Sequence, residues 1–150
     1  MYSKPLSSSV VEFPPYQSLL HPYQLRVLQE AKRYNVVNCG RRWGKTVLGK
    51  DVSAEAALAG WPVGWFAPGY RYLSEAWREM VKALDPYTAR SNATEHRIEL
   101  VTGGVVEMWS LDGGNAGRSR KYKRVVIDEA AMVPALMTVW NDAIRPTLTE

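Results

Sequence analysis

The sequence contains a single cysteine, Cys39, and only two histidines. One cysteine cannot form an internal disulfide, so the composition gives no sign of an oxidising compartment. His21 and His96 have no metal-ligand spacing with Cys39 or with each other, which argues against a structural zinc site. No run of 18 or more apolar residues is present, and residues 1–11 lack the charged start and apolar centre of a signal peptide. We therefore expect neither a disulfide framework nor a membrane anchor.

Apolar and aromatic residues are plentiful. Hydrophobic residues make up 46% of the 150-residue chain, with six Trp and eight Tyr, which is too apolar for a disordered protein and fits one folded unit. Residues 1–20 are rich in Ser and Pro, so we expect an extended arm there and a domain over residues 21–150. The net charge of +4 permits a polyanionic partner without requiring one.

Apolar periodicity predicts alternating strands and helices after the arm. Two segments, residues 98–101 and 105–109, flank a short Gly-rich loop and are typical of an antiparallel hairpin. The run at residues 125–127 is apolar throughout, which is typical of a fully buried parallel strand. The order predicts an α/β fold whose mostly parallel sheet is flanked by helices. The other predicted elements are helices at residues 22–33, 46–59, 70–84 and 135–143, and strands at residues 34–38 and 62–67.

A phosphate-binding loop is predicted between the strand at residues 34–38 and the helix that follows, which is the context the P-loop motif requires. Backbone N–H groups of the loop would surround phosphate oxygens, Lys45 would neutralise the β and γ phosphates of ATP, and the Thr46 hydroxyl would bind Mg²⁺. Cys39 stands where the motif has its first glycine, and Gly-Lys-Thr alone also begins ordinary helices. Arg41 and Arg42 are either solvated or stabilise charge during transfer. The loop reads Cys39-Gly40-Arg41-Arg42-Trp43-Gly44-Lys45-Thr46.

Two adjacent carboxylates, Asp128 and Glu129, follow the apolar strand at residues 125–127. Ligands bind outside the carboxyl ends of strands in open α/β sheets. Asp128 could hold Mg²⁺ while Glu129 polarises the attacking water, a division that phosphoryl transfer to water needs. The alternative is that the pair caps the start of a helix.

Several segments taken together resemble one family. They are Pro22-Tyr23-Gln24, CGRRWGKT, FAPGYRYLSEAW, GRSRKYKRVVIDEAAMVP and the closing IRPTLTE. From about residue 21 onward the chain resembles the ATPase domain of phage terminase large subunits. The resemblance implies an additional-strand P-loop NTPase fold and ATP hydrolysis that drives viral double-stranded DNA into a procapsid. It also implies that the family's next strand and nuclease domain are absent, which leaves the fold incomplete at its C-terminal end.

The resemblance assigns roles to three more side chains. Gln24 matches the glutamine that reads the adenine edge through its amide, although a plain glutamine on a helix surface is an alternative. Arg42 matches the family's loop arginine. Arg118 resembles an arginine presented to a neighbouring subunit's nucleotide, a role worth about 10³ to 10⁵ in rate. The sequence leaves open which arginine acts in this way, because the same stretch carries four more cations: Arg120, Lys121, Lys123 and Arg124.

We therefore predict a Mg²⁺-dependent ATP hydrolase in which Lys45, Arg42, Arg118 and Glu129 are the catalytic groups. Two alternatives stay open: a helicase-like, nucleic-acid-dependent ATPase, and a non-catalytic nucleotide-binding assembly module. By resemblance, the partners are double-stranded DNA, a portal protein and a small terminase subunit. The resemblance also implies a homo-oligomeric ring located in the host cytoplasm, without membrane contact.

Overall fold

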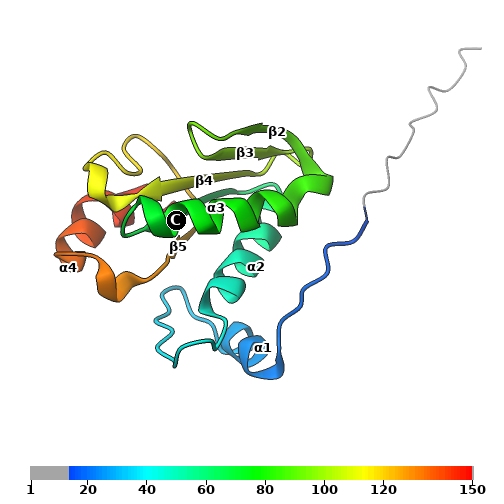
Figure 1. Cartoon of the computed structure of the whole chain (residues 1–150), viewed down its shortest axis with the longest axis horizontal. Helices are drawn as coiled ribbons and strands as arrows, with labels where there is room; N and C mark the ends of the chain where they lie inside the picture. The colour runs from blue at the N-terminus through cyan, green and yellow to red at the C-terminus, as the bar shows by residue number, and fades with distance from the viewer. Residues whose placement is uncertain (1–13, 150) are drawn as a thin grey trace, which may run out of the picture.

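A five-stranded sheet organises the chain in the computed structural model, which describes residues 14–149 (Figure 1). The strands are β1 (Pro62–Ala67), β2 (Thr88–Asn92), β3 (Arg97–Leu100), β4 (Val105–Ser110) and β5 (Arg124–Ile127). The α-helices are α1 (Pro22–Gln29), α2 (Lys45–Leu58), α3 (Tyr70–Leu84) and α4 (Leu136–Val139). Short 3₁₀ helices are η1 (Asp85–Tyr87), η2 (Leu111–Gly113), η3 (Ala130–Met132) and η5 (Arg145–Thr147), and η4 (Trp140–Ile144) is a π-helix that continues α4.

The strands lie in the order β2-β3-β4-β1-β5. β1 pairs in parallel with β4 and β5, whereas β3 pairs antiparallel with β2 and β4. The described sheet is therefore mixed rather than mostly parallel, because β3 runs antiparallel to both of its neighbours. β1, β4 and β5 still point the same way, so their carboxyl ends meet at one edge.

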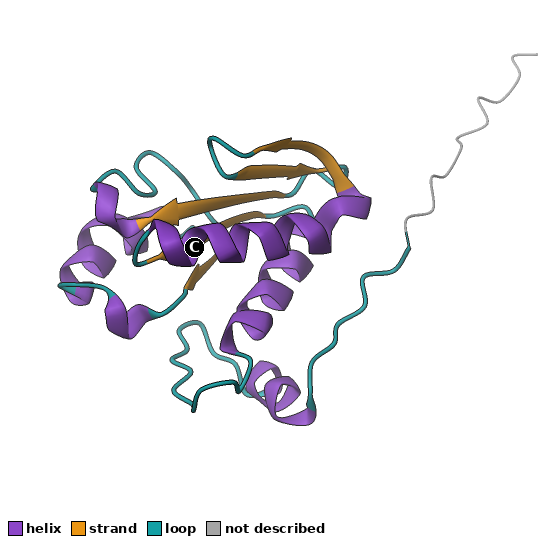
Figure 2. Cartoon of the chain, in the orientation of Figure 1, coloured by secondary structure: helices purple, strands orange, loops and turns teal. Residues whose placement is uncertain are grey.

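Helices α2 and α3 cover one face of the sheet (Figure 2). α2 packs against β1 and β5, and α3 packs against β4 and β1. Side chains alternate between the two faces along a strand, so Trp65 of β1 enters the core beneath the helices while its neighbour Phe66 enters a second apolar cluster on the opposite face. That second cluster includes Tyr122 and Ile144, and the segment carrying α4 and η4 packs against it.

Most of the predicted elements are confirmed. β1 and α3 have the predicted bounds, α2 begins one residue earlier than predicted, and β3 and β4 form the expected antiparallel hairpin. The structure adds β2, whose sequence Thr-Ala-Arg-Ser-Asn has no apolar alternation and which lies at the exposed end of the sheet. No described helix is long and apolar enough to cross a membrane.

The predicted strand at residues 34–38 does not form. Asn35 instead closes a turn with Lys32, donating to its carbonyl at 2.7 Å and accepting from its backbone N–H at 2.8 Å. Val36 is 95% exposed. A strand needs a neighbour to bond its backbone groups, and among the described residues the sheet ends at β5 with no strand beyond it to pair with this segment.

Three further expectations need correction. The first helix ends at Gln29 rather than residue 33, and its buried residue is Gln24, whereas Leu25 of the predicted apolar face is 44% exposed. β5 is half-buried rather than fully buried, because it is the outermost described strand on its side of the sheet. Residues 14–20 of the predicted arm form neither helix nor strand, and Tyr16 packs against the core. Residues 1–13 of the predicted arm lie outside the described residues.

Candidate functional site

The predicted phosphate loop folds as a turn that leads directly into α2. The Lys45 ammonium reaches back across the loop and donates to the carbonyls of Cys39 at 2.9 Å and Gly40 at 3.2 Å. Arg42 has a φ of 61° and Gly44 has a φ of 93°, so two left-handed residues give the loop its curvature. The first backbone N–H groups of a helix have no partner within it, so the start of α2 offers donors to an anion.

Gln24 of α1 holds this loop in place. Its side chain is 2% exposed, its Nε2 donates to the Gly44 carbonyl at 2.9 Å, and its Oε1 accepts from the His21 backbone N–H at 2.9 Å. The His21 Nε2 lies 2.9 Å from the Trp43 carbonyl. The alternative of a plain surface glutamine is therefore wrong, and adenine recognition by Gln24 stays a prediction. Contact with the loop also explains Gly44, because a Cβ there would lie 2.5 Å from Gln24 Nε2.

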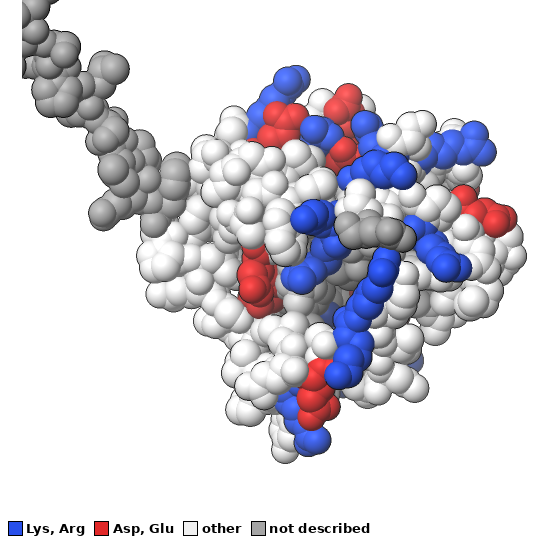
Figure 3. Space-filling view, turned by 180° about the vertical axis from the view of Figure 1, so that it is seen from behind, with Lys and Arg blue, Asp and Glu red and all other residues white. Residues whose placement is uncertain are grey.

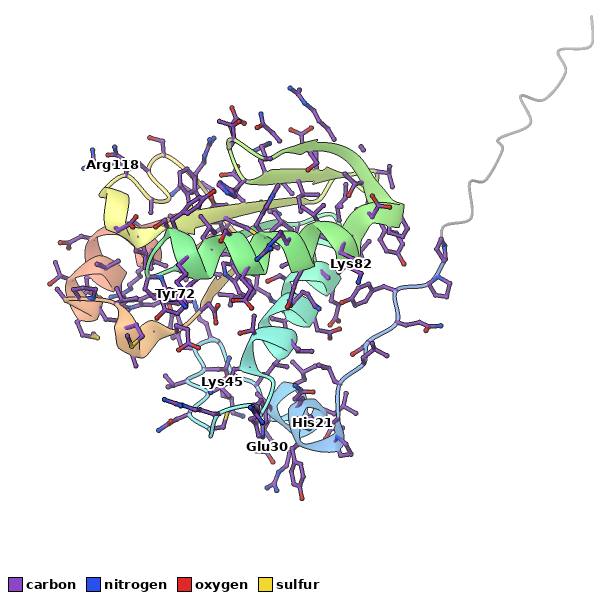
Figure 4. All side chains as sticks on the ribbon, in the orientation of Figure 1. His21, Glu30, Lys45, Tyr72, Lys82 and Arg118 are labelled. Carbon is purple, nitrogen blue, oxygen red and sulfur yellow. The ribbon has the colours of Figure 1, made fainter. Side chains whose placement is uncertain are left out.

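The loop-holding role of His21 was not foreseen. The signal was available in the sequence, since a residue able to cap a helix stands three positions before Gln24 with proline between them, the spacing of a capping box. His21 caps α1 by accepting from the Gln24 backbone N–H at 3.3 Å, and the other nitrogen of its ring faces the loop. Figure 4 shows His21 and Lys45 at the same end of the molecule.

The acidic pair reaches the same place from the other direction. β5 runs parallel to β1, and the backbone N–H of Asp128 extends that ladder by donating to Phe66 at 2.8 Å. The Asp128 carboxylate thereby emerges at the sheet edge where α2 begins. There the Thr46 hydroxyl donates to its Oδ1 at 3.3 Å, although 82 residues separate the two in sequence.

This oxygen pair suits a magnesium ion. Two ligand oxygens bound side by side to octahedral Mg²⁺ at about 2.1 Å lie roughly 3.0 Å apart, and the Thr46 and Asp128 oxygens already stand close to that separation. Burial raises the pKa of Asp128 above its ordinary value, and the nearby charge of Glu129 raises it further, although hydrogen bonds from Thr46 and from the Glu129 backbone oppose the shift. Burial and a neighbouring negative charge disfavour the ionised form of a carboxyl group, and a bound cation would stabilise it.

That electrostatic cost predicts a pH-dependent gain of stability in Asp128→Asn. A carboxyl whose pKa is higher in the folded than in the unfolded chain destabilises the fold while it is charged, and the cost is relieved as the pH falls through the folded pKa. The metal-free variant should therefore melt at a higher temperature than the parent at pH 7, with the difference shrinking toward acid pH. Thermal melts across this range measure it, and an unchanged or lower melting temperature at pH 7 would contradict the assignment.

Glu129, the residue after Asp128, lies on the surface of the molecule. It is exposed and adopts a left-handed conformation, with φ 48° and ψ 44°. Only the three-residue helix η3 comes after it, and its side chain makes no capping hydrogen bond. The alternative that the acidic pair caps an α-helix is therefore wrong, and the carboxylate of Glu129 is open to solvent beside Asp128.

The arginines divide into two groups. Arg41 and Arg42 are exposed on the phosphate loop, with no side-chain partner among the described residues. Arg118 lies elsewhere: it is exposed on the loop after η2, and Figure 4 places it at the opposite end of the molecule from Lys45. One chain therefore does not bring Arg118 to its own phosphate loop, and a role of Arg118 at a neighbouring copy stays a prediction.

A cavity of about 540 Å³ borders the Arg118 loop. Arg118, Arg120 and Lys121 line one side, and residues of α4 and η4, including Asp142, line the other. Figure 3 shows the rear face of the molecule, where Lys and Arg side chains gather around the centre. The sequence did not predict this hollow, because it depends on how η4 packs beside the loop.

Comparison with known proteins gives one informative relation. Part of the chain is similar to a phage terminase large subunit. The match is 29% identical over 87 residues to the terminase large subunit of Escherichia phage T5, and it spans 56% of this chain but only 20% of that protein. No family model matches, and no solved structure matches. The match is a similarity of the matched part alone, and this chain covers about a fifth of that relative's length.

Proposed function

We propose that this chain is the ATP-hydrolysing part of a terminase large subunit, which packages double-stranded phage DNA into a procapsid. The observation that carries the proposal is the 3.3 Å contact between Thr46 and Asp128. It joins the start of α2, where a phosphate would bind, to the acidic end of β5, where a metal would bind. The partial similarity to a terminase large subunit supports the DNA-packaging role.

Each side chain has a distinct part in the proposed reaction. The loop backbone and Lys45, once released from the Cys39 and Gly40 carbonyls, hold the β and γ phosphates of ATP. Thr46 and Asp128 hold Mg²⁺, which when bound neutralises charge on the phosphate oxygens. Glu129, exposed beside Asp128, orients and deprotonates the attacking water.

Two arginines would complete the charge balance. Arg42 stands in the loop itself, where a guanidinium can stabilise the negative charge that develops on the transferred phosphoryl group. Arg118 would reach the nucleotide of a neighbouring copy, which requires a homo-oligomeric ring. The portal protein and small terminase subunit are the proposed partners at the procapsid, in the host cytoplasm.

Phosphate release from Mg²⁺-ATP, with and without double-stranded DNA, tests the proposal. Lys45→Ala should abolish nucleotide binding and turnover, because the phosphates lose their cation. Lys50→Ala is the matched control, since Lys50 lies on the same helix but pairs with Glu79 at 3.7 Å, away from the loop. Equal activity in both variants, or no ATP binding by the parent, would refute it.

The two alternatives give different results in the same assays. A helicase-like ATPase would unwind a DNA duplex and would not bind the portal. A non-catalytic module would bind ATP, but the parent chain would not hydrolyse it. Substituting Glu129 would then leave turnover unchanged at zero.

A further inference from the structure

One buried carboxylate lies far from the phosphate loop. Glu107, in the middle of β4, is only 6% exposed. It accepts hydrogen bonds from the guanidinium of Arg97 on the neighbouring strand and from the Tyr122 hydroxyl at 2.8 Å, and it forms an ion pair with Arg120 at 3.0 Å. The Tyr122 hydroxyl in turn accepts from the Trp109 indole at 2.8 Å. A buried charge is tolerated only when it is paired and fully hydrogen-bonded, and here the pairing is complete.

Arg120 belongs to the same loop as Arg118, and its ion pair with Glu107 joins that loop to β4. The Arg120 guanidinium also sits 5.9 Å from the centre of the Trp109 ring. The loop is poor in backbone bonds that could hold it otherwise: Arg118 donates to Asn115 at 3.3 Å and Arg120 to Gly117 at 3.1 Å, both within the loop. Ala116 anchors the start of the loop in the apolar cluster with Phe66 and Tyr122. Between Arg118 and Arg120, the ion pair with Glu107 is the polar contact that joins the loop to the sheet.

The other cations of residues 120–124 have partners among the described residues, whereas Arg118 does not. Lys121 donates to the Pro146 carbonyl at 3.4 Å, Lys123 lies 5.0 Å from the centre of the Trp61 ring, and Arg124 donates to the Val52 carbonyl at 3.1 Å. Among these cations, Arg118 is the one whose side chain has no hydrogen bond, ion pair or ring contact with any described residue.

We propose that Glu107 is a positioning residue: by holding Arg120 against the sheet, it presents Arg118 outward at the rim of the 540 Å³ cavity, toward a neighbouring copy's nucleotide. The catalytic consequence rests on the proposed function, whereas the positioning of the loop does not. A misplacement of about 1 Å in a group that contacts the reacting phosphate costs roughly 10²-fold in rate. Loss of the Glu107–Arg120 pair should have an effect of that size.

Limited trypsin cleavage tests the positioning without any need for ATPase activity. In Glu107→Gln, well below its melting temperature, cleavage after Arg118 should become several-fold faster than in the parent, because the loop is released. Glu99→Gln is the matched control: it removes another partner of Arg97, at 3.0 Å, and does not touch the Arg118 loop. Should Glu107→Gln fail to fold, Arg120→Gln replaces it, because Arg120 is half-exposed and its loss leaves the carboxylate with Arg97 and Tyr122.

Mixed assemblies test the catalytic consequence. A Lys45→Ala donor supplies Arg118 but cannot use ATP, and an Arg118→Ala acceptor uses ATP but supplies no arginine, so only their mixture should hydrolyse ATP. Adding Glu107→Gln to the donor should lower this activity roughly 10²-fold. Adding it to the acceptor should leave the activity of the mixture unchanged, a difference that a merely structural role of Glu107 cannot produce.

The outcomes separate the two claims. Equal loss in donor and acceptor, or no loss in the donor, overturns the positioning role. If neither the parent nor any mixture hydrolyses ATP, the proposed function fails, and trypsin cleavage alone decides: faster cleavage after Arg118 in Glu107→Gln supports the positioning role, and unchanged cleavage overturns it.

Discussion

Glu129→Gln is expected to leave ATP binding intact and to lower ATP turnover by about 10²- to 10⁴-fold, the usual contribution of a general base. The glutamine keeps the size and hydrogen-bonding reach of the glutamate but cannot accept a proton from water. Glu129 is exposed and forms no ion pair with a described residue, so the variant should fold normally. Calorimetric titration with ATP and single-turnover hydrolysis measure the two quantities separately.

Glu75→Gln is the control for this variant. Glu75 lies on α3, and its charge also raises the pKa of Asp128, so both substitutions remove a negative charge that acts on the same carboxyl. Glu75 does not lie at the carboxyl end of β5, so Glu75→Gln should leave the rate of ATP turnover nearly unchanged. A Glu129→Gln variant that hydrolyses ATP at the parent rate, or that loses ATP binding, would contradict the proposed role.

Gly104→Ala should cost about 3 kcal/mol or more in the free energy of unfolding. Gly104 is buried in the hairpin turn, and an added Cβ would come within 1.7 Å of the Ala57 carbonyl oxygen in α2. That oxygen cannot move easily, because it accepts from the Gly60 N–H at 3.0 Å and from the Thr102 hydroxyl at 3.1 Å. The variant would push α2, which carries Lys45 and Thr46, away from the sheet.

Gly103→Ala tests whether the cost of Gly104→Ala comes from the clash with α2 or from strain in the hairpin turn. Gly103 has a φ of 89° but no atom within 4 Å of an added Cβ, so its substitution should cost only about 1 kcal/mol of backbone strain. Urea unfolding of both variants gives the comparison. Equal costs would show that α2 does not lie against the hairpin as described.

The sequence predicted the elements whose own pattern decides their structure. The spacing of Leu73, Trp77 and Leu84 placed α3 at its observed bounds, because these side chains face the core. The strand at residues 34–38 failed for the opposite reason: β-branched Val36 and Val37 favour a strand only where a neighbouring strand accepts their backbone bonds. β2 was missed because an exposed edge strand needs no apolar pattern.

Some residues of the candidate site could likewise be predicted from the local sequence, and others could not. The residue types of the loop and of Asp128-Glu129 imply their chemistry directly, and the Thr46–Asp128 contact agrees with their being one site. The roles of His21 and Glu107 depend on contacts between segments distant in sequence, 22 residues apart for His21 and Trp43. No local pattern encodes such a contact, so only the folded chain distinguishes Arg118, which is unpaired among the described residues, from the engaged Arg120.

The most direct test of a shared Mg²⁺-nucleotide site is a double-mutant cycle on affinity for a non-hydrolysable ATP analogue. The four proteins are the parent, Thr46→Val, Asp128→Asn and the double variant, each titrated with Mg²⁺ and again with a chelator. If both oxygens bind one ion, the effects should be non-additive by about 0.5–3 kcal/mol with Mg²⁺. The coupling should be clearly smaller with the chelator, where only the hydrogen bond between Thr46 and Asp128 joins the two side chains. Additive losses in the presence of Mg²⁺ would mean that the two side chains do not serve one metal-bound nucleotide.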